Sequence, residues 1–305
     1  MNGPEKFLII GINGLVGEYL CRELGSRYSV TGTYRSRPVA GAFKCDITSE
    51  ANVKEVFNEV KPTHVIHCAN LAGGVPYCQT NAAEAERLHF EGTKSIGRCC
   101  LRYGAKLVFI STECVFDGRQ EAYSEDDPVN PLSIYGMWKA ASEAWIRKEI
   151  PNHVIVRTMS VFGWQPQTKT PNAFMNAFLE ISAGRCVYAP THKMRQPTYV
   201  RYLARALRLL SEGKIAGLFH FAGDDFVNRY EWLRRIFVRM GWDTTRLVLR
   251  TGFSEEDSYH PPRVKFNCQK YLRTFPGERL GALDEALVAL ADDVKAYAAL
   301  DAGCV

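Results

Sequence analysis

A tyrosine and a lysine are four positions apart in the segment YGMWK, residues 135–139. On an α-helix this spacing places the side chains of Tyr135 and Lys139 on one face, one turn apart. A phenol with a pKa of about 10 transfers protons poorly at neutral pH unless a neighbouring positive charge favours its ionised form. The ammonium group of Lys139 would supply that charge. Any helix can contain this spacing, so the pair predicts proton transfer to or from an oxygen atom of a substrate only together with the two segments described next.

The segment STECVFDG, residues 111–118, directly follows an apolar run at residues 106–110. Such a run is typical of a buried strand. In an open parallel sheet, ligands bind outside the carboxyl ends of the strands, so Thr112 would face the reaction centre and donate a hydrogen bond to a substrate carbonyl. The alternative is structural, because a serine or threonine also caps the loop that follows a strand.

A glycine-rich turn, GINGLVG at residues 11–17, lies between an apolar run at residues 7–10 and a predicted helix. Glycines at these positions permit a tight turn, close approach of a pyrophosphate to the backbone, and close packing of the helix. The helix N-terminus would add oriented N–H groups. We therefore expect the turn to bind a dinucleotide through Gly11, Asn13, Gly14, Leu15, Val16 and Gly17.

The residues at the end of the second predicted strand indicate whether the dinucleotide is NAD or NADP(H). NAD-binding proteins place an acidic residue there to hold the ribose hydroxyls. This chain instead has Tyr34, Arg35, Ser36 and Arg37. Arg35, with Ser36 or Arg37, would bind a 2′-phosphate, which favours NADP(H); the alternative is a solvated basic loop. Asp46 and Ile47 are expected near the adenine, although an aspartate before a helix can equally be a cap.

The elements that must position these residues alternate between strand and helix. Predicted strands near residues 7–10, 29–34, 42–45, 64–68, 106–110 and 154–156 are interspersed with predicted helices at 14–27, 49–60, 82–103 and 133–149. Continuous apolar strands separated by helices predict an α/β fold with a doubly wound parallel sheet. We expect a nucleotide-binding domain over residues 1–157. Residues 158–305 would form a smaller substrate-binding lobe, with parts near 195–222 returning to the core.

Composition excludes several classes of function. The chain has 305 residues and a formal charge of +5 from scattered basic residues, which does not indicate a nucleic-acid surface. No run approaches the roughly 20 apolar residues of a membrane span, and no signal peptide is evident. The ten cysteines lack metal-ligand spacing. We therefore expect a cytoplasmic protein without a metal site that acts on a small molecule.

The ordered motifs GINGLVG, HCAN, STECVFDG, YGMWK and VRT resemble those of the extended short-chain dehydrogenase/reductase superfamily, whose nucleotide domain is a Rossmann fold. VFDG together with QPT at residues 196–198 looks most like the dTDP-4-dehydrorhamnose reductase family. The resemblance implies that Thr112, Tyr135 and Lys139 are catalytic and that a C-terminal lobe holds a nucleotide sugar. It further implies a possible homodimer and additional cofactor neighbours at Cys68, Ala69, Asn70, Ser111 and Thr158.

The chain departs from this family around the expected substrate. The family usually reads STDYVFDG, so Glu113 replaces an aspartate and Cys114 replaces a tyrosine. Met159 and Ser160 stand where a tryptophan is frequent, and His89 stands where an asparagine is common. His89 would support the site through a hydrogen bond or simply be a half-buried helical histidine. The substrate contacts implied by the resemblance are Thr112, Glu113, Cys114, Met159, Ser160, Arg195 and Gln196.

These observations favour an NADPH-dependent reductase of a keto group on a nucleotide-activated sugar, with Tyr135 as the proton donor. A nucleotide-sugar epimerase or dehydratase is one alternative, and Glu113 is where its extra acid–base group would be sought. A different class remains open, because the β subunit of methionine adenosyltransferase is a relative that acts through a partner. The chain would then be a non-catalytic NADP-binding regulatory subunit.

Overall fold

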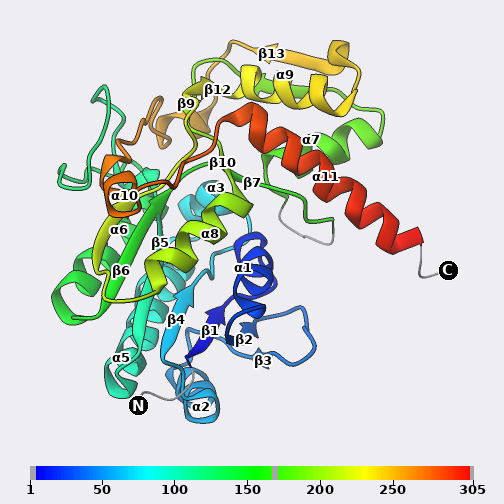
Figure 1. Ribbon diagram of the computed structural model, residues 1–305. Coiled ribbons are helices and arrows are strands. Elements are labelled where there is room, and N and C mark those ends of the chain that lie inside the picture. Colours follow the sequence, from blue (N-terminus) through cyan, green and yellow to red (C-terminus); the bar gives the residue numbers. More distant parts are fainter. Residues whose placement is uncertain (1–4, 167–170, 303–305) are drawn as a thin grey trace.

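The computed structural model describes residues 5–166 and 171–302 and has a seven-stranded parallel sheet at its centre. The strand order is β11-β6-β5-β4-β1-β2-β3, and every neighbouring pair runs parallel (Figure 1). This order confirms the predicted doubly wound α/β fold. The strands are β1 Lys6–Ile10, β2 Ser29–Tyr34, β3 Phe43–Lys44, β4 His64–His67, β5 Lys106–Thr112, β6 His153–Thr158 and β11 Gly217–His220.

Both faces of the sheet are buried, which explains why the central strands are continuous apolar runs. In β1, Phe7 and Ile9 pack into one core with helices α1 (Leu15–Gly25) and α8 (Val200–Ser211). Leu8 and Ile10 pack into the other core, with α2 (Glu50–Val60), α5 (Thr93–Tyr103) and α6 (Ile134–Glu149). The two helical layers hold the strand ends in fixed positions.

The segment predicted as one helix over residues 82–103 is divided in the structure. It consists of α4 (Ala82–Glu86), a π-helical turn η1 (Arg87–Gly92) and α5, preceded by the unpredicted helix α3 (Gly74–Thr80). The hydrophobic pattern of a π-helical turn differs little from that of an α-helix, so periodicity did not reveal it. π-Helical turns within α-helices are frequent at functional sites.

After β6 the chain leaves the sheet and forms a lobe at one end of the molecule (Figure 1). The lobe contains helices α7 (Ala173–Ser182) and α9 (Arg229–Met240) and three short strand pairs. The pairs are β7 (Val161–Phe162) with β10 (Thr198–Tyr199), β8 (Val187–Pro190) with β13 (Leu247–Arg250), and β9 (Met194–Arg195) with β12 (Val227–Asn228). Short 3₁₀ turns η3 (Thr244–Arg246) and η4 (Glu255–Ser258) complete the lobe, whereas helix α10 (Gln269–Thr274) lies beside β11 of the sheet.

The C-terminal helix α11 (Leu283–Ala302) is fixed to α1, β10 and α8 through Asp293. The Asp293 carboxylate accepts hydrogen bonds from the phenols of Tyr19, at 2.9 Å, and Tyr199, and it pairs with Arg201. Tyr19 belongs to α1, the helix that follows the glycine-rich turn, so α11 restrains that helix. Within the described part of the chain, no helix is both long and apolar enough to cross a membrane.

Candidate active site

The carboxyl ends of the parallel strands bring the predicted motifs to one edge of the sheet. The glycine turn follows β1, the Arg35 segment follows β2, residues 68–70 follow β4, and a 3₁₀ turn η2 (Glu113–Val115) follows β5. Ala69 lies against the glycine turn, because a Cβ atom on Gly11 would be 3.2 Å from the Ala69 backbone. Segments separated by up to a hundred residues therefore border one site, as expected for this topology.

The glycine turn is closed by backbone contacts that exclude larger residues. Gly11 has φ +88°, which favours glycine, and its N–H donates to the Thr33 carbonyl at 3.2 Å. A Cβ atom on Gly17 would be only 2.3 Å from the Gly11 oxygen. No side chain of residues 5–166 or 171–302 caps the N-terminus of α1 at Gly14. The first N–H groups of α1, at Leu15 and Val16, thus remain suited to an anionic ligand.

Gly17→Ala is expected to lower the free energy of unfolding by about 1–3 kcal/mol, because the added methyl group overlaps the turn. Urea unfolding followed by circular dichroism measures this change. Gly25→Ala is the matched control, since Gly25 lies at the other end of α1 and a Cβ atom there would have no described atom within 4 Å. An equal loss in both variants would contradict the tight packing of the turn.

The two arginines after β2 differ in their contacts. The Arg35 side chain is 56% exposed and its guanidinium is 3.5 Å from the Glu84 carboxylate, a weak pairing. Arg37 instead donates to the Asn13 carbonyl at 2.6 Å, and the Asn13 amide donates back to the Arg37 carbonyl at 2.7 Å. Arg37 and Asn13 therefore brace the glycine turn, whereas the Arg35 guanidinium can reach a ligand.

The predicted cofactor neighbours that follow β2, β3 and β4 lie in or next to turns. Burial opposes ionisation of Asp46, but hydrogen bonds from Thr48 outweigh it and lower the pKa of Asp46. Asp46 thus orders the turn before α2, while Ser49 caps that helix. The Asn70 side chain likewise accepts from the next backbone N–H, at Leu71. Ile47, Cys68 and Ser36 flank these turns, and Ser36 is exposed.

Tyr135 and Lys139 lie on the buried face of α6. Ser133 caps the helix by accepting from the Gly136 N–H at 3.1 Å. Gly136 has no room for a side chain, since its Cβ would be 2.1 Å from the Cys114 carbonyl oxygen, so α6 begins directly against η2. This close approach explains the glycine within the YGMWK segment. It places the Tyr135 side chain beside the residues that end β5.

The Lys139 ammonium group is held inside the protein. It donates to the Ile110 carbonyl at 2.6 Å and lies over the Phe109 ring at 4.2 Å. Burial lowers the pKa of Lys139 to about 8, although the negative charge of Glu143 opposes this effect. The side chain is therefore close to its titration range at neutral pH.

The pKa of Tyr135 differs from the sequence-based expectation. Burial raises it above the ordinary value, and the groups at Cys114 and Glu113 raise it further, while Thr112 opposes the shift. The prediction is that Lys139 and an oxidised nicotinamide together bring this pKa toward neutrality; burial acts in the opposite direction. The phenol consequently carries its proton at neutral pH and is available as a donor.

Thr112, Glu113 and Arg195 form a hydrogen-bonded chain across the site. The Thr112 hydroxyl donates to the Glu113 carboxylate at 2.8 Å and accepts from the Cys114 N–H at 3.1 Å. The second Glu113 oxygen accepts from the Arg195 guanidinium at 3.3 Å. Arg195 also donates to the carbonyl groups of residues 194, 261 and 262. These bonds use four of the five N–H groups of the guanidinium, so Arg195 anchors Glu113 to the segments at residues 194 and 261–262.

The other predicted substrate contacts are Gln196, Met159 and Ser160, and the first two make contacts inside the protein. The Gln196 side-chain amide donates to the Gly223 carbonyl at 3.0 Å and its oxygen accepts from the Phe266 N–H at 2.6 Å. Met159 is buried, and its sulfur contacts the Gln196 N–H. Ser160 has φ +44°, a strained value for a serine. Gln196 thus joins segments of the lobe, and Met159 and Ser160 form the turn between sheet and lobe.

Arg229 is a cation that the sequence did not single out, because its segment reads as a surface helix. It is the first residue of α9, and its guanidinium lies 4.8 Å from the centre of the Trp232 ring. Burial and the positive charge of Arg195 lower its pKa to about 10, and the charge of Glu113 opposes this. Among the described residues no ion pair to Arg229 is present. Arg229 is therefore available to an anionic ligand.

A buried ion pair connects the active-site helix to the sheet. Glu143 lies one turn beyond Lys139 and binds Arg157 of β6, with its closest contact at 2.6 Å; both side chains are at most 3% exposed. Ser111 donates to the same carboxylate, so the residue expected beside the cofactor is used inside the protein. The Arg157 guanidinium also donates to His220 Nε2 at 3.3 Å. Thr158 is buried nearby, and its hydroxyl has no hydrogen-bond partner among the described residues.

His89 is buried against Tyr135. The two rings meet edge to face with centroids 5.1 Å apart, and His89 Nε2 lies 3.7 Å from the Cys78 sulfur. Burial lowers the pKa of His89 to about 3, so the ring is neutral at neutral pH. Its carbonyl accepts from Thr93 and Ser142, both at 2.6 Å, which stabilises the π-helical turn. His89 forms the wall behind Tyr135.

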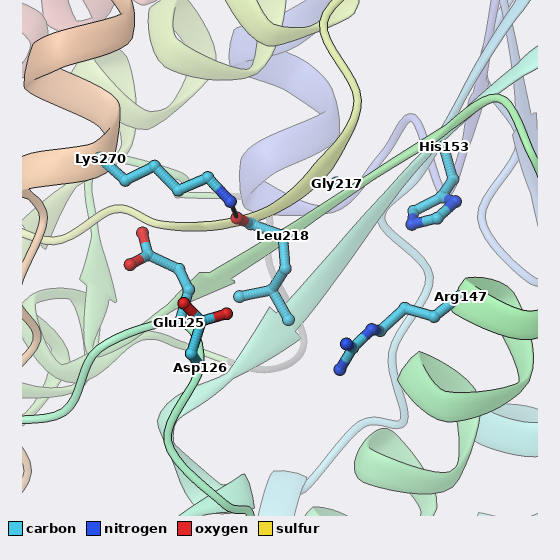
Figure 2. A pocket seen from close by; sticks show the side chains of 7 residues that line it. All are labelled: Glu125, Asp126, Arg147, His153, Gly217, Leu218 and Lys270. Atoms are coloured by element: carbon cyan, nitrogen blue, oxygen red, sulfur yellow. Dashed lines mark hydrogen bonds between the residues drawn. The ribbon is translucent and has the colours of Figure 1, made fainter.

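A cavity of about 320 Å³ lies away from these residues, beside the edge strand β11 (Figure 2). Arg147 of its lining is twelve residues after Tyr135, which corresponds to about 18 Å along α6. Its Lys270 donates to the Leu218 carbonyl, and Glu125 accepts from the His220 N–H, so two of its charged groups cover the open edge of β11. No group of histidine, cysteine and acidic residues suited to a metal is present among the described residues.

Comparisons with known proteins agree with this arrangement. A family model described as the RmlD substrate binding domain matches residues 5–291. Methionine adenosyltransferase 2 subunit beta of Danio rerio is 29% identical over 277 residues, 87% of this chain and 84% of that protein. dTDP-4-dehydrorhamnose reductase of Aggregatibacter actinomycetemcomitans is 26% identical over 242 residues, 76% of this chain and 78% of that protein.

A solved structure shares the whole fold. dTDP-4-dehydrorhamnose reductase of Bacillus anthracis str. Ames, in complex with NADP, has a TM-score of 0.83 and covers 95% of this chain and 99% of its own, at 24% identity. At that identity the likeness establishes the fold. The family model matches nearly the complete chain, including both the sheet and the lobe. The protein therefore belongs to the RmlD substrate-binding domain family.

Proposed function

We propose that the protein is an NADPH-dependent reductase of a keto group on a nucleotide-activated sugar. The observation that carries this proposal is the position of a protonated, buried Tyr135 beside Thr112, at the sheet edge that also carries the glycine turn. A dehydrogenase of this type needs a proton donor and a dinucleotide site at one edge. The reductases among the relatives support the same assignment.

The residues present fit a dinucleotide. The glycine turn leaves no space for a Cβ at Gly17, and the N-terminus of α1, where no described side chain forms a cap, offers N–H groups to a pyrophosphate. Arg35 would bind the 2′-phosphate, exchanging its weak contact with Glu84 for a bidentate one. Lys139 would donate to the ribose hydroxyls. When bound, NADPH supplies the hydride for the carbonyl carbon.

Side chains of the protein would supply the proton and stabilise the charge that develops on the carbonyl oxygen. Tyr135 donates its phenolic proton to the carbonyl oxygen as negative charge develops there. Thr112 transfers its hydrogen bond from Glu113 to the same oxygen and stabilises that charge. A nucleoside diphosphate would lie against the lobe, where Arg229 offers a positive charge that no described acidic residue pairs with. These roles require no metal.

The proposal is tested by following NADPH absorbance with a panel of nucleotide-activated keto sugars. Turnover of a 4-keto-6-deoxy sugar is expected, with NADPH preferred over NADH. Absence of turnover across the panel, despite tight NADPH binding, would reject the reductase assignment.

A second candidate is a non-catalytic NADP-binding regulatory subunit. The similarity to methionine adenosyltransferase 2 subunit beta favours it, since that relative is described as a subunit. Binding of NADPH without turnover, together with co-purification of another enzyme, would support it. The epimerase or dehydratase alternative has less support, because both oxygens of Glu113 are already hydrogen-bonded to Thr112 and Arg195.

The affinity for NADPH is expected to fall about 3- to 10-fold as the pH rises from 7 to 9.5. Lys139, with a pKa of about 8 in the free protein, is charged below that pH and loses its proton above it. The lost charge weakens its hydrogen bonds to the ribose. Fluorescence titration at several pH values measures the effect. In Lys139→Met the affinity should be low and independent of pH over this range, and an unchanged pH dependence would remove Lys139 from the cofactor site.

A further inference from the structure

Lys139 and Glu143 lie one turn apart on the buried face of α6, and strand β5 holds both of them. The Lys139 ammonium group donates to the Ile110 carbonyl at 2.6 Å. The Glu143 carboxylate accepts from the hydroxyl of the next residue, Ser111. Both residues are at most 4% exposed. Opposite charges that are this well shielded from water act on each other more strongly than they would at the surface.

The Glu143 carboxylate is fixed in its position. Arg157, which lies opposite Ser111 in the register of β5 and β6, donates to both carboxylate oxygens in contacts of 2.6, 3.0 and 3.1 Å. The Ser111 hydroxyl adds a further donor. An ionised carboxylate has about four acceptor sites, and these contacts occupy them. Glu143 therefore acts on Lys139 through its charge and keeps its place while doing so.

Titratable side chains from the other elements packed around Lys139 are neutral at neutral pH. Burial raises the pKa of the phenol and of both thiols in this set, and it lowers the pKa of both imidazoles. The set comprises Tyr135 on α6, His67 and Cys68 at the end of β4, Cys78 on α3 and His89 in the π-helical turn. Glu143 stays ionised because it pairs with Arg157. Of these groups, Glu143 alone brings a negative charge to Lys139.

We propose that Glu143 is a positioning residue of the cofactor site, which keeps the Lys139 ammonium group charged at neutral pH and thus able to bind the ribose hydroxyls. Its carboxylate is occupied by Arg157 and Ser111, so it acts through Lys139 and not on the cofactor itself. Burial lowers the pKa of Lys139 to about 8, and the charge of Glu143 opposes this. The inference rests on the proposed function, in which Lys139 holds the ribose.

The test measures the pKa of Lys139 by NMR, from the chemical shift of its ε-carbon in ligand-free protein that contains isotope-labelled lysine. The signal of Lys139 is assigned by its absence in Lys139→Met. Combining Glu143→Gln with Arg157→Met removes both charges and keeps side chains of similar size, which preserves most of the stability. We expect the pKa of Lys139 to fall by about 0.5–1.5 pH units in this double variant, since the favourable charge is lost.

Arg157→Met alone should shift the pKa of Lys139 in the opposite direction. It leaves the Glu143 carboxylate without its neutralising partner, so the ammonium form of Lys139 is favoured more strongly. Because both variants carry the same methionine, a loss of packing would move the pKa in the same direction in both. If Arg157→Met does not fold, the double variant compared with the wild-type protein decides the matter. An unchanged pKa in the double variant, or shifts of equal sign in the two variants, overturns the inference.

Glu149→Gln is the matched control, because Glu149 is an exposed acid near the end of the same helix and pairs only weakly with Lys148, at 3.6 Å. It should leave the pKa of Lys139 unchanged. A shift as large as that of the double variant would show that any charge on α6 has this effect, and it would contradict a specific role for Glu143.

The pH dependence of NADPH binding connects the measured pKa to the cofactor site. Lys139 is charged below its pKa, so a lower pKa in the double variant should move the loss of NADPH affinity to lower pH by the same interval. These measurements need no turnover. A Lys139 pKa and an affinity midpoint that both follow Glu143 support the inference even if no sugar is reduced. Turnover of a keto sugar with a Lys139 pKa that ignores Glu143 supports the reductase assignment and rejects the inference.

Discussion

Tyr135→Phe is expected to lower kcat for ketone reduction about 10²- to 10⁴-fold with little change in NADPH affinity. The substitution removes the only proposed proton donor and keeps the ring that packs against His89. The pKa of Tyr135 is raised by burial, so the wild-type phenol stays protonated across the neutral range. Single-turnover measurement of NADPH oxidation reports the chemical step directly.

The control for this variant is Tyr77→Phe, which removes the exposed phenol that donates to Glu84. It should keep kcat within about twofold, since Tyr77 lies on α3 and holds only a surface carboxylate. A Tyr135→Phe protein that retained wild-type kcat would show that the proton comes from another group. The proposed roles of both Tyr135 and Thr112 would then need revision.

Arg157→Met is expected to lower the free energy of unfolding by about 3–5 kcal/mol. The change removes the partner of the Glu143 carboxylate, whose side chain is only 3% exposed. Among the described residues, Ser111 is then its remaining hydrogen-bond donor. His220 Nε2 also loses its donor. Urea unfolding at neutral pH, with the slope of the transition checked for constancy, gives the difference.

Two further variants distinguish a buried charge from simple loss of packing. Combining Arg157→Met with Glu143→Leu should recover most of the stability, because an apolar pair of similar size avoids the desolvation cost. Arg234→Met removes an arginine that pairs with Glu231 at the surface, and it should cost less than about 1 kcal/mol. If the double variant were as unstable as Arg157→Met, packing alone would explain the loss.

The parallel sheet was predictable because each of its central strands can be identified from a short segment of the sequence. Each central strand is a short apolar run, and most of the runs are followed by a helix. A sheet buried on both faces requires this pattern, and the right-handed crossover then fixes the arrangement of neighbours. The glycine turn was equally visible, because Gly17 is required by its contact with the backbone of Gly11 and Ile12, a few residues away.

Other features depend on residues that are distant in the chain. Nothing in the order of the sequence brings Glu143 to Arg157 and Ser111, or Glu113 to Arg195, which is 82 positions away. The short strand β11 completes the sheet only because the chain returns from the lobe. The resemblance implied a substrate contact at Arg195, and only the folded structure shows that its side chain also donates to three carbonyl groups of the lobe.

The sequence by itself determined the alternation of strand and helix, the glycine turn and the pairing of Tyr135 with Lys139, since each follows from the spacing of neighbouring residues. The tertiary structure decided the environment of these groups. Burial of Tyr135 and Lys139 sets the direction of both pKa shifts, and packing of the lobe against the sheet decides which charges are paired and which, such as Arg229, remain available. The physical reason is that desolvation and ion pairing depend on which atoms surround a group in space, and local sequence does not specify them.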